Sequence, residues 1–445
     1  MFARQHALVS LLALQLLAAS DAHAEPPKRA LPDYDGRPET SSAGHTLLVI
    51  PRVLLSPLYL VSEYVVRRPL GFLVSGAERA HLPEALYDFF VFGPNHRAGI
   101  IPIAFLDFGF YPSVGLYFFC DDAFVTGHDL RIRASTWGKD WLAASWSDTF
   151  QLDRLTDLAF VASATRRPDY RYYGIGSQTV EADRSRYAAT RLEAGLKLEL
   201  KFAGLSRFSS GVGVRRVHFH RGEFGHDHTL EENVALERYP TPDGYARGYT
   251  LLYSQVALVI DSRRARPEVG SGVRLELRAE QLSQIEPKAH GSFFRYGATA
   301  GGFLDLGAYG RIVSLSVALA FIDPLASGEP IPFTELAAVG GEGSMRGFVP
   351  GRLLGRSSAV TTLRYRWPIW VWLDGSIQLA AGNVFEAHLS GFQPKLLRLS
   401  AAIGVESVGS PDSSLEILLG AGTETFEHGT QVSSLRLVVG SNHGF

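Results

Sequence analysis

Two short segments of the chain carry side chains whose types and spacing could do chemistry. The first, HFHRGEFGHDHT, places imidazoles and a carboxylate close together: His218, His220, His226, Asp227 and His228. Side chains of these types at this spacing can bind zinc or copper. The second, GGEGSMRGFVPG, holds a single arginine, Arg346, among five glycines. What either segment can do depends on the elements that hold it.

The surroundings of these segments argue against a metal centre and against catalysis. The histidine cluster falls in a long predicted connection, so a polar outer loop is favoured over a metal site. Ser344 follows Gly343, but no GxSxG elbow surrounds this serine. The stretch GIGSQT lacks the lysine of a phosphate-binding loop. We therefore expect no enzyme activity, no cofactor and no bound metal.

The composition and charge of the chain limit its class. The 445 residues are 46% hydrophobic and 11% aromatic, which argues against a disordered chain. The formal net charge is −2, whereas a nucleic-acid-binding protein usually carries a basic stripe, so we expect no nucleic-acid partner. The single cysteine, Cys120, excludes a disulfide within the chain.

Residues 1–24 are predicted to be a secretory signal peptide. Arg4 supplies the positive start, residues 7–19 form an apolar core, and the stretch Ala22-His23-Ala24 fits the small-x-small cleavage rule. The alternative is an N-terminal membrane anchor, but the apolar core is too short to span a bilayer. The sequence therefore predicts export through a cleaved signal peptide.

Residues 25–95 are predicted to be a periplasmic linker followed by an amphipathic helical segment. The linker begins with the proline-rich stretch EPPKRALPDYDGRPETSS. Prolines and charges then interrupt the apolar run of residues 45–74, so we expect no transmembrane helix there. The broken helix could lie on a membrane surface or against the end of a barrel, or it could be an ordinary packed helix.

From residue 96 to residue 445 the hydrophobic pattern has a period of two, which indicates strands with one apolar face. In RLEAGLKLELKF, apolar residues alternate with charged ones. Many repeats reach about ten residues, whereas strands of soluble proteins average about five or six. Because lipid tolerates no unpaired backbone group, such strands must close into a barrel. The sequence predicts an all-β fold: a 16-stranded antiparallel transmembrane β-barrel with a short N-terminal helical segment.

The even strand number places both ends of the barrel domain on the periplasmic side. The longest predicted connections each follow an odd-numbered strand and therefore fall on the extracellular side: residues 167–185, 220–248 and 323–355. Arg346 lies in the last of these, between strands eleven and twelve. Together with the signal peptide, this topology predicts a location in the bacterial outer membrane.

The last strand carries features of an insertion signal. Four apolar residues share one parity, and the chain ends on the last of them: Leu435, Leu437, Val439 and Phe445. A terminal aromatic residue on the lipid-facing row suits insertion at the membrane interface. The pattern resembles the C-terminal signal of outer-membrane barrels, although His443 departs from it.

This topology leaves two interpretations of Arg346. At the tip of an outer loop, the arginine would be solvated and the glycines would serve turns. Alternatively, the loop folds back into the barrel. A polar lumen could then hold the guanidinium among carboxylates, and the glycines would let the backbone pass close to the wall.

The segment GGEGSMRGF resembles the loop-six signature of the BamA/TamA superfamily of outer-membrane assembly and transport barrels, the bacterial surface antigen family. The matching residues are Gly340, Gly341, Met345, Arg346, Gly347 and Phe348. Three more stretches are similar to family segments: YYGIGSQT with Tyr173, Gly174 and Gly176, ALVIDSRRARPEVGSGVRLEL with Asp261 and Arg263, and LAAGNVF. The resemblance covers residues 95–445 and implies sixteen strands, with this loop between strands eleven and twelve.

One departure from the family concerns the partner of Arg346. In the family, the loop arginine meets an acid two residues before the glycine of the Gly-Asn-Val-aromatic stretch, and the matching residue here is Ala380. An unpaired buried charge would cost several kcal/mol, so another acid is expected to substitute. The candidate lumenal partners are Asp374, Glu386, Glu406 and Glu416.

The resemblance implies a role in inserting or translocating protein or lipid at the outer membrane, through a weak lateral seam between the first and last strands. The implied partners are outer-membrane lipids and an unfolded barrel or lipid client. A second departure is that residues 25–95 lack the pattern of a periplasmic polypeptide-binding domain. The alternative function is a passive pore or a structural barrel, and a pore predicts a wide open lumen.

Overall fold

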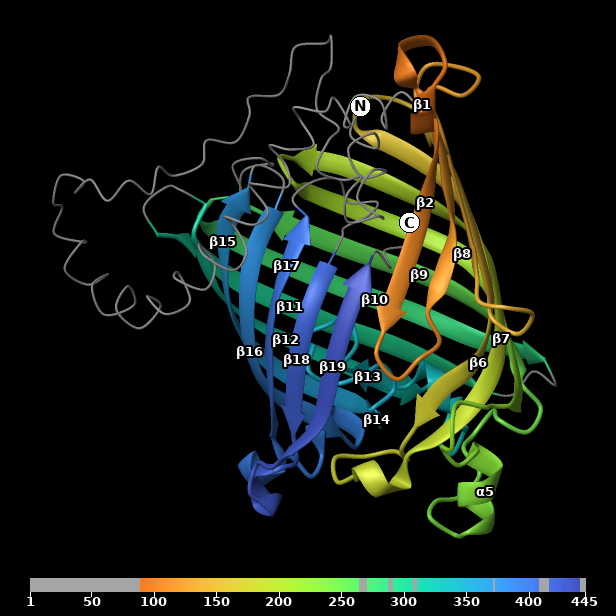
Figure 1. Cartoon of the computed structure of the whole chain (residues 1–445), viewed down its shortest axis with the longest axis vertical. Helices are drawn as coiled ribbons and strands as arrows, with labels where there is room; N and C mark the ends of the chain where they lie inside the picture. The colour runs from red at the N-terminus through yellow and green to blue at the C-terminus, as the bar shows by residue number, and fades with distance from the viewer. Residues whose placement is uncertain are drawn as a thin grey trace, which may run out of the picture.

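The alternating segments form antiparallel strands that close into a barrel (Figure 1). The computed structural model describes residues 89–263, 270–286, 291–306, 310–370, 373–407 and 416–440. The predicted signal peptide and most of the predicted linker and helical segment, up to residue 88, lie outside these ranges. Within the described ranges, no helix has the length and apolar character needed to cross a membrane.

Sixteen strands make the wall, which confirms the predicted count and antiparallel order. Their bounds are Ala98–Asp107 (β2), Ser113–Cys120 (β3), His128–Thr136 (β4), Leu142–Gln151 (β5), Thr156–Tyr172 (β6), Ser185–Ala203 (β7), Ser206–Arg221 (β8), Tyr249–Asp261 (β9), Gly272–Glu286 (β10), Ser292–Asp305 (β11), Ile312–Pro324 (β12), Ser357–Trp370 (β15), Leu373–Phe385 (β16), Arg398–Ser407 (β17), Glu416–Thr423 (β18) and Val432–Gly440 (β19). Each strand pairs with its neighbours along the chain, and β19 pairs back to β2.

The period of two decides which side chains face outward. On β10, Val273 and Leu277 are exposed on the outer surface. Glu276, which has the opposite parity and faces the lumen, is buried and pairs with Arg274 at 2.6 Å. Apolar residues thus meet lipid while charged residues pair within the lumen, as in other transmembrane barrels.

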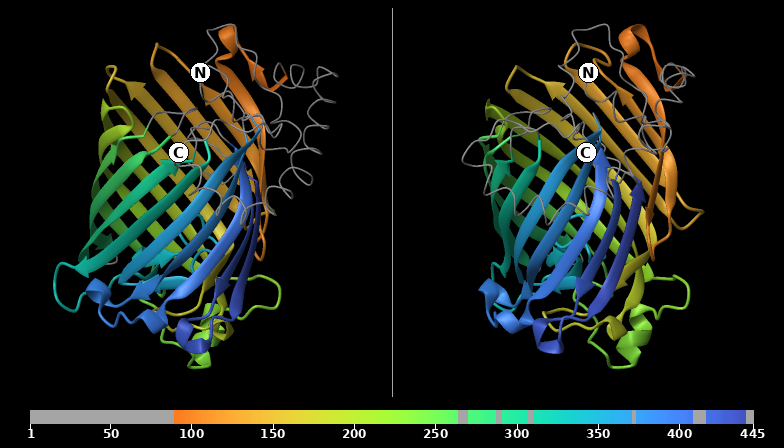
Figure 2. Two further views of the ribbon diagram at one scale, coloured as in Figure 1. Left: turned by 90° about the vertical axis from the view of Figure 1, so that its left-hand side faces the viewer. Right: turned by 60° about the vertical axis from the view of Figure 1, so that its left-hand side comes forward.

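The two ends of the barrel carry connections of different length (Figure 2). One end, here named the loop end, holds the connections 173–184, 222–248 and 325–356, the second of which contains α5 (Leu230–Ala235). The opposite turn end holds β1 (Val91–Phe92) and tight turns such as residues 204–205. The predicted topology places the loop end outside the cell.

The largest apolar cluster lies inside the barrel near the loop end. It joins Tyr172, Tyr187 and Tyr249 of the wall to Phe333 of the 325–356 connection. The ring centroids of Tyr172 and Tyr187 lie 5.2 Å and 5.3 Å from that of Phe333. These contacts show that the connection packs into the barrel instead of extending into solvent.

Candidate functional site

Loop six, defined as residues 325–356 between β12 and β15, enters the lumen (Figure 1). It contains a small hairpin of β13 (Ala337–Val339) and β14 (Leu353–Gly355). Met345 and Phe348 of this loop are completely buried. Arg346, between them, is also buried, so the tip of the loop lies inside the barrel and not in solvent.

Glycines shape the tip of loop six. Gly340 and Gly341 have φ values of +115° and +71°, which residues with a Cβ rarely adopt. The amide of Gly341 donates to the carbonyl oxygen of Phe348 at 2.8 Å, and the amide of Phe348 donates to that of Met345 at 3.0 Å. The resulting tight turn presents Arg346 to the wall.

Gly347 lies directly against the inner wall. A Cβ at this position would lie 2.0 Å from the carbonyl oxygen of Ala421 on β18, so the approach requires glycine. The amide of Gly347 donates to Ser400 Oγ on β17 at 2.8 Å, and its carbonyl accepts from Ser434 Oγ on β19 at 2.9 Å. The tip of loop six is therefore bonded to the last strands of the barrel.

Arg346 forms an ion pair with Glu416 on β18. The two side chains are only 10% and 11% exposed, so water screens the pair weakly. Glu416 is one of the four acids that parity and spacing offered as a partner. The guanidinium thus has a carboxylate beside it although the acid on β16 is missing.

The other three candidate acids lie elsewhere. Glu406 binds Arg364 at 2.5 Å, and Asp374 lies 3.4 Å from Arg366. Both of these arginines extend from β15. Glu386 is exposed just after the end of β16, at the loop end.

Ala380 lies where the family has its acid, and the structure gives a physical reason for the change. Ala380 belongs to a buried apolar cluster with Met345, Phe348 and Val384. A carboxylate there would be desolvated by these side chains. The small apolar side chain of Ala380 therefore suits this cluster, whereas a carboxylate would not.

A second buried arginine joins loop six to the junction of the first and last wall strands. Arg436 Nη2 on β19 lies 2.9 Å from Asp107 Oδ2 on β2, with the side chains 2% and 5% exposed. The same guanidinium donates to the carbonyl oxygens of Gly341 and Arg346. We name the Arg436–Asp107 pair the seam clasp. Sequence reasoning missed it, although Arg436 lies on the inward parity of the last strand.

The junction itself, named the seam, is a short ladder. The described residues of β19 form three residue pairs with β2, whereas β3, on the other side of β2, forms eight pairs with it. One more backbone hydrogen bond, 2.9 Å long, joins the amide of Phe108 to the carbonyl of Leu437. The three pairs are Val438 with Asp107, Val439 with Leu106, and Gly440 with Phe105.

Glu335 provides a second anchor for loop six, on another part of the wall. It is 1% exposed and lies 2.7 Å from Arg215 Nη1 on β8. It also accepts a hydrogen bond from the Tyr249 hydroxyl at 2.8 Å and lies 3.5 Å from Arg295 on β11. The family signature does not include Glu335, and no other motif in the sequence pointed to this residue.

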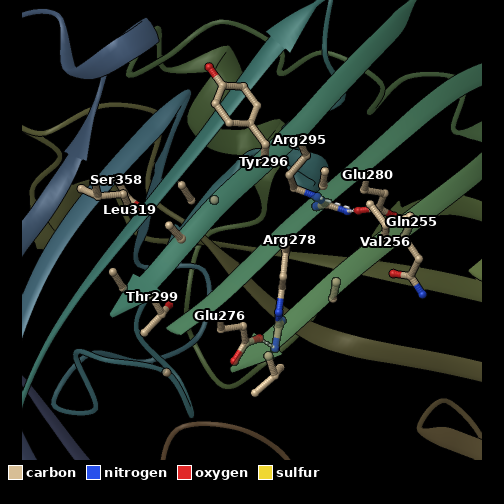
Figure 3. A pocket seen from close by; sticks show the side chains of 18 of the residues that line it. Gln255, Val256, Glu276, Arg278, Glu280, Arg295, Tyr296, Thr299, Leu319 and Ser358 are labelled. Carbon is tan, nitrogen blue, oxygen red and sulfur yellow. Dashed lines mark hydrogen bonds and ion pairs between the residues drawn. The ribbon is translucent and has the colours of Figure 1, made fainter. Parts of the chain in front are cut away.

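A lumenal cavity of about 760 Å³ lies beside the second anchor (Figure 3). Charged side chains of opposite sign line it in pairs. Arg295 donates to Glu280 at 2.9 Å, and Arg278 pairs with Glu276. The lumen is therefore polar, and loop six occupies part of it.

The connection 173–184, which begins with the aromatic-glycine stretch, caps loop six at the loop end. Arg352 of loop six has no exposed surface and donates to Thr179 Oγ1 at 2.7 Å. Its guanidinium also lies 4.7 Å from the ring centroid of Tyr173. Burial, followed by the positive charge of Arg398, lowers the pKa of the Arg352 guanidinium.

The Gly-Asn-Val-aromatic stretch holds the same connection from β16. Asn383 Nδ2 donates to the carbonyl oxygen of Ser177 at 3.0 Å and to that of Leu396 at 2.6 Å. Arg398 donates to the carbonyl of Thr179 at 2.7 Å. Two of the three additional family-like stretches thus meet beside loop six.

The remaining family-like stretch lies apart, at the turn end. Arg263 pairs with Asp261 at 2.6 Å and stacks over the ring of Phe303 at 4.0 Å. This local contact shapes the end of β9.

Two members of the histidine cluster, His218 and His220, lie with their ring centroids 5.2 Å apart. Within the described part of the chain, no three His, Cys, Asp or Glu side chains are placed to hold a metal ion. Asp227 instead binds Arg186 at 2.7 Å and Arg184 at 2.9 Å. Burial acts to raise the pKa of Asp227, but the hydrogen bonds and charges of Arg186 and Arg184 outweigh it and hold the pKa below its usual range.

The apolar row of the last strand faces outward as far as the structure describes it. Leu435 is 71% exposed, and Leu437 and Val439 share its parity. Phe445 lies outside the described residues. The insertion signal therefore stays a prediction.

Comparisons with known proteins agree with this architecture. The Omp85 superfamily domain matches residues 106–407. The chain is similar to the crystal structure of BamA from Haemophilus ducreyi lacking POTRA domains 1-3, with a TM-score of 0.55 and 15% identity over 78% of this chain and 70% of that one. It is also similar to CdiB from Escherichia coli, with a TM-score of 0.50 and 12% identity over 77% of this chain and 62% of that one. At such identities these two likenesses show the fold alone.

No curated protein gives a significant sequence match. The superfamily match nevertheless spans most of the barrel, and it agrees with the strand count and with the place of loop six. The resemblance to the BamA/TamA superfamily is therefore confirmed. The chain belongs to the Omp85 superfamily and is a non-enzymatic β-barrel of the outer membrane.

Proposed function

We propose that this barrel inserts or translocates protein or lipid at the outer membrane by opening at the seam. The observation that carries the proposal is the short ladder, with three described pairs between β19 and β2 against eight between β2 and β3. Among the described residues, fewer backbone hydrogen bonds join this junction than its neighbour, so fewer must break to open it. An opened seam would expose two strand edges, which can pair with another chain.

Loop six would hold the seam closed. Arg346 joins the loop tip to Glu416, and Arg436 joins the same tip to Asp107 across the seam. Opening would separate Arg436 from Asp107 and leave two buried charges without their partner, which is costly. A client that enters the seam would have to compensate for this loss.

Superfamily membership supports an assembly or transport role in general. Profiles of outer-membrane proteins and lipids distinguish a protein client from a lipid client. We would compare the outer-membrane proteome and lipid profile of a strain lacking the chain with those of the parent strain. Loss of a defined set of barrels would identify a protein client, and loss of lipid asymmetry would identify a lipid client. An unchanged profile would favour the passive pore or structural barrel.

The seam itself is tested by locking it with a disulfide. Leu106→Cys with Val439→Cys places two thiols on a seam pair, in a Cys120→Ser background. The matched control, Ile403→Cys with Leu419→Cys, places two thiols on a pair between β17 and β18. Each variant is produced in the deletion strain and oxidised. We expect the control variant to restore the outer-membrane profile of the parent strain, and the seam variant to fail to restore it. Full restoration by the locked seam would refute the proposed mechanism.

A further inference from the structure

The outer surface of β3 to β8 carries an apolar groove beside a basic pocket, neither of which the seam or loop six explains. The groove has a volume of about 610 Å³. One row of cross-strand neighbours on five adjacent strands forms its floor: Leu116, Ala134, Ala144, Ala164 and Leu192. The three small alanines between two leucines leave a trough on the lipid-facing surface, which an acyl chain can fill.

The basic pocket adjoins the groove at the loop end. It has a volume of about 510 Å³ and shares Arg166 with the groove. Its lining contains four basic side chains against two acidic ones: Lys139, Arg166, Arg167 and Arg221 against Asp140 and Glu223. Tyr111 and Trp137 also line it. Tyrosine and tryptophan are typical of the membrane–water interface, so the pocket lies at the level of lipid headgroups.

Some of these basic side chains form ion pairs with acidic residues, and others have no acidic partner. Arg166 lies 3.5 Å from Asp140, with both side chains about half exposed, Arg167 pairs with Asp169 at 3.1 Å, and Arg221 pairs with Glu232 at 2.6 Å. Lys139 has no hydrogen bond or ion pair with any residue that the structure describes. Lys139 is therefore the basic group of the pocket that is left to attract an anion.

Arg216 adds a positive charge to the lipid-facing surface beside the groove. Its neighbour Arg215 faces the lumen and binds Glu335, whereas Val214 is exposed on the outer surface. Arg216 shares the outward parity of Val214, is exposed, and is the cross-strand neighbour of Leu192. Its side chain too lacks a hydrogen-bonding or ionic partner within the described ranges. A guanidinium is costly in hydrocarbon, and an anionic headgroup would offset that cost.

We propose that this surface binds a lipid with an anionic phosphate headgroup, in the leaflet at the loop end. The acyl chain lies in the alanine-floored groove, and the phosphate accepts charge-assisted hydrogen bonds from Lys139 and Arg166 of the pocket. Arg216, opposite Leu192 of the groove, adds its positive charge from β8. The positive charges of Lys139 and Arg216, whose side chains have no acidic partner within the described ranges, match the charge of such a headgroup. The site does not require the seam to open, so it stands independently of the proposed function.

The headgroup part is tested by native mass spectrometry of the full chain in detergent. The probes are phosphatidylglycerol and phosphatidylcholine with identical acyl chains. We expect preferential retention of phosphatidylglycerol, and Arg166→Gln with Arg216→Gln should weaken it about ten- to thirtyfold. The matched control removes two exposed charges of other loop-end connections, Lys395→Gln with Arg247→Gln, and should bind like the wild type. Equal retention of the two lipids, or an unchanged affinity of the first double variant, would overturn the proposal.

The acyl part is tested with all charges in place. Ala144→Trp fills the groove and should weaken phosphatidylglycerol binding, while the heat-modifiable mobility of the barrel on a gel shows that it folds. Inorganic phosphate should not displace the lipid, because it lacks the acyl chain. Unaltered binding by the tryptophan variant, or displacement by inorganic phosphate, would show a free phosphate site and not a lipid site.

Discussion

The pairing of Arg346 with Glu416 shows how a buried charge constrains its surroundings. The family acid on β16 is replaced by Ala380, and the guanidinium meets a carboxylate on β18 instead. Removing one partner of a buried pair costs far more than replacing both by apolar groups. The acid on β16 can therefore be lost only when another lumenal carboxylate, here that of Glu416, can reach the guanidinium of Arg346.

This reasoning gives a prediction for Glu416→Gln. The variant keeps the shape but leaves the guanidinium of Arg346 without its carboxylate, so we expect the free energy of unfolding to fall by about 3–5 kcal/mol. Urea unfolding in lipid vesicles, followed by tryptophan fluorescence, measures it. Glu386→Gln, which changes an exposed acid, should be neutral. Arg346→Met combined with Glu416→Leu should recover most of the loss, and failure to do so would contradict the ion-pair explanation.

A second prediction at the same scale concerns Gly347. In Gly347→Ala the new methyl group would meet the Ala421 carbonyl oxygen at 2.0 Å, so the loop tip must move away from β18. Overpacking of this kind typically costs about 1–3 kcal/mol. The same unfolding experiment measures it. Gly343→Ala is the matched control, because its nearest contact would be 3.6 Å away. Equal stability of the two variants would show that Gly347 is not a contact point.

At the scale of elements, the long connections of the loop end hold one another in place. The connection 222–248 contributes Asp227, which binds Arg184 of the connection 173–184 and Arg186 at the start of β7. The connection 173–184 in turn binds Arg352 of loop six. The three connections therefore form one cap, and a change at Asp227 can reach loop six.

The cap should respond to acid. The pKa of Asp227 in the folded protein lies below its ordinary value because Arg186 and Arg184 outweigh the effect of burial. Its stabilising contribution is therefore complete above about pH 4 and is lost as the pH falls through the folded pKa. A fluorophore on His226→Cys in a Cys120→Ser background should report increased mobility on acidification.

The control for this experiment is Asp227→Asn, which carries no titratable group at that position. It should be mobile at neutral pH and show no acid transition. If the acid transition persists in this variant, another group controls the cap, and the assignment to Asp227 is wrong.

At the scale of the whole molecule, loop six crosses the lumen between two anchors. Glu335 binds Arg215 and Arg295 on β8 and β11, while Arg346 binds Glu416 on β18. These contacts tie distant parts of one closed sheet to each other through the loop. The barrel is therefore braced internally, and its open cross-section depends on both anchors.

We expect the wild-type barrel to conduct ions poorly in a planar bilayer, because loop six occupies part of the lumen. Releasing both anchors, by Glu335→Gln with Arg346→Ala, should raise single-channel conductance by more than the sum of the two single changes, since either anchor alone still holds the loop. Strictly additive effects would mean that the anchors act independently. Unchanged conductance in the double variant would show that these two anchors do not control the open cross-section of the lumen.

Much of this architecture could be predicted because its cause is local. The period of two, the strand lengths and the turn positions are properties of neighbouring residues, and they predicted sixteen strands and the inward parity of Glu406 and Glu416. The glycine-rich signature placed the loop between the eleventh and twelfth strands. The predicted helical segment lies outside the described residues, so it stays a prediction.

The choice of partners was decided only by the tertiary structure. Parity could not choose between Glu406 and Glu416, because the choice depends on the path of loop six and on Arg364, which takes Glu406. The seam clasp joins residues at opposite ends of the barrel sequence, Asp107 and Arg436. Alternation acts between neighbours along the chain, whereas a lumenal contact exists only after the sheet has closed and the loop has entered it. The sequence by itself therefore determined the wall and the sides of its strands, and closure decided which charges meet.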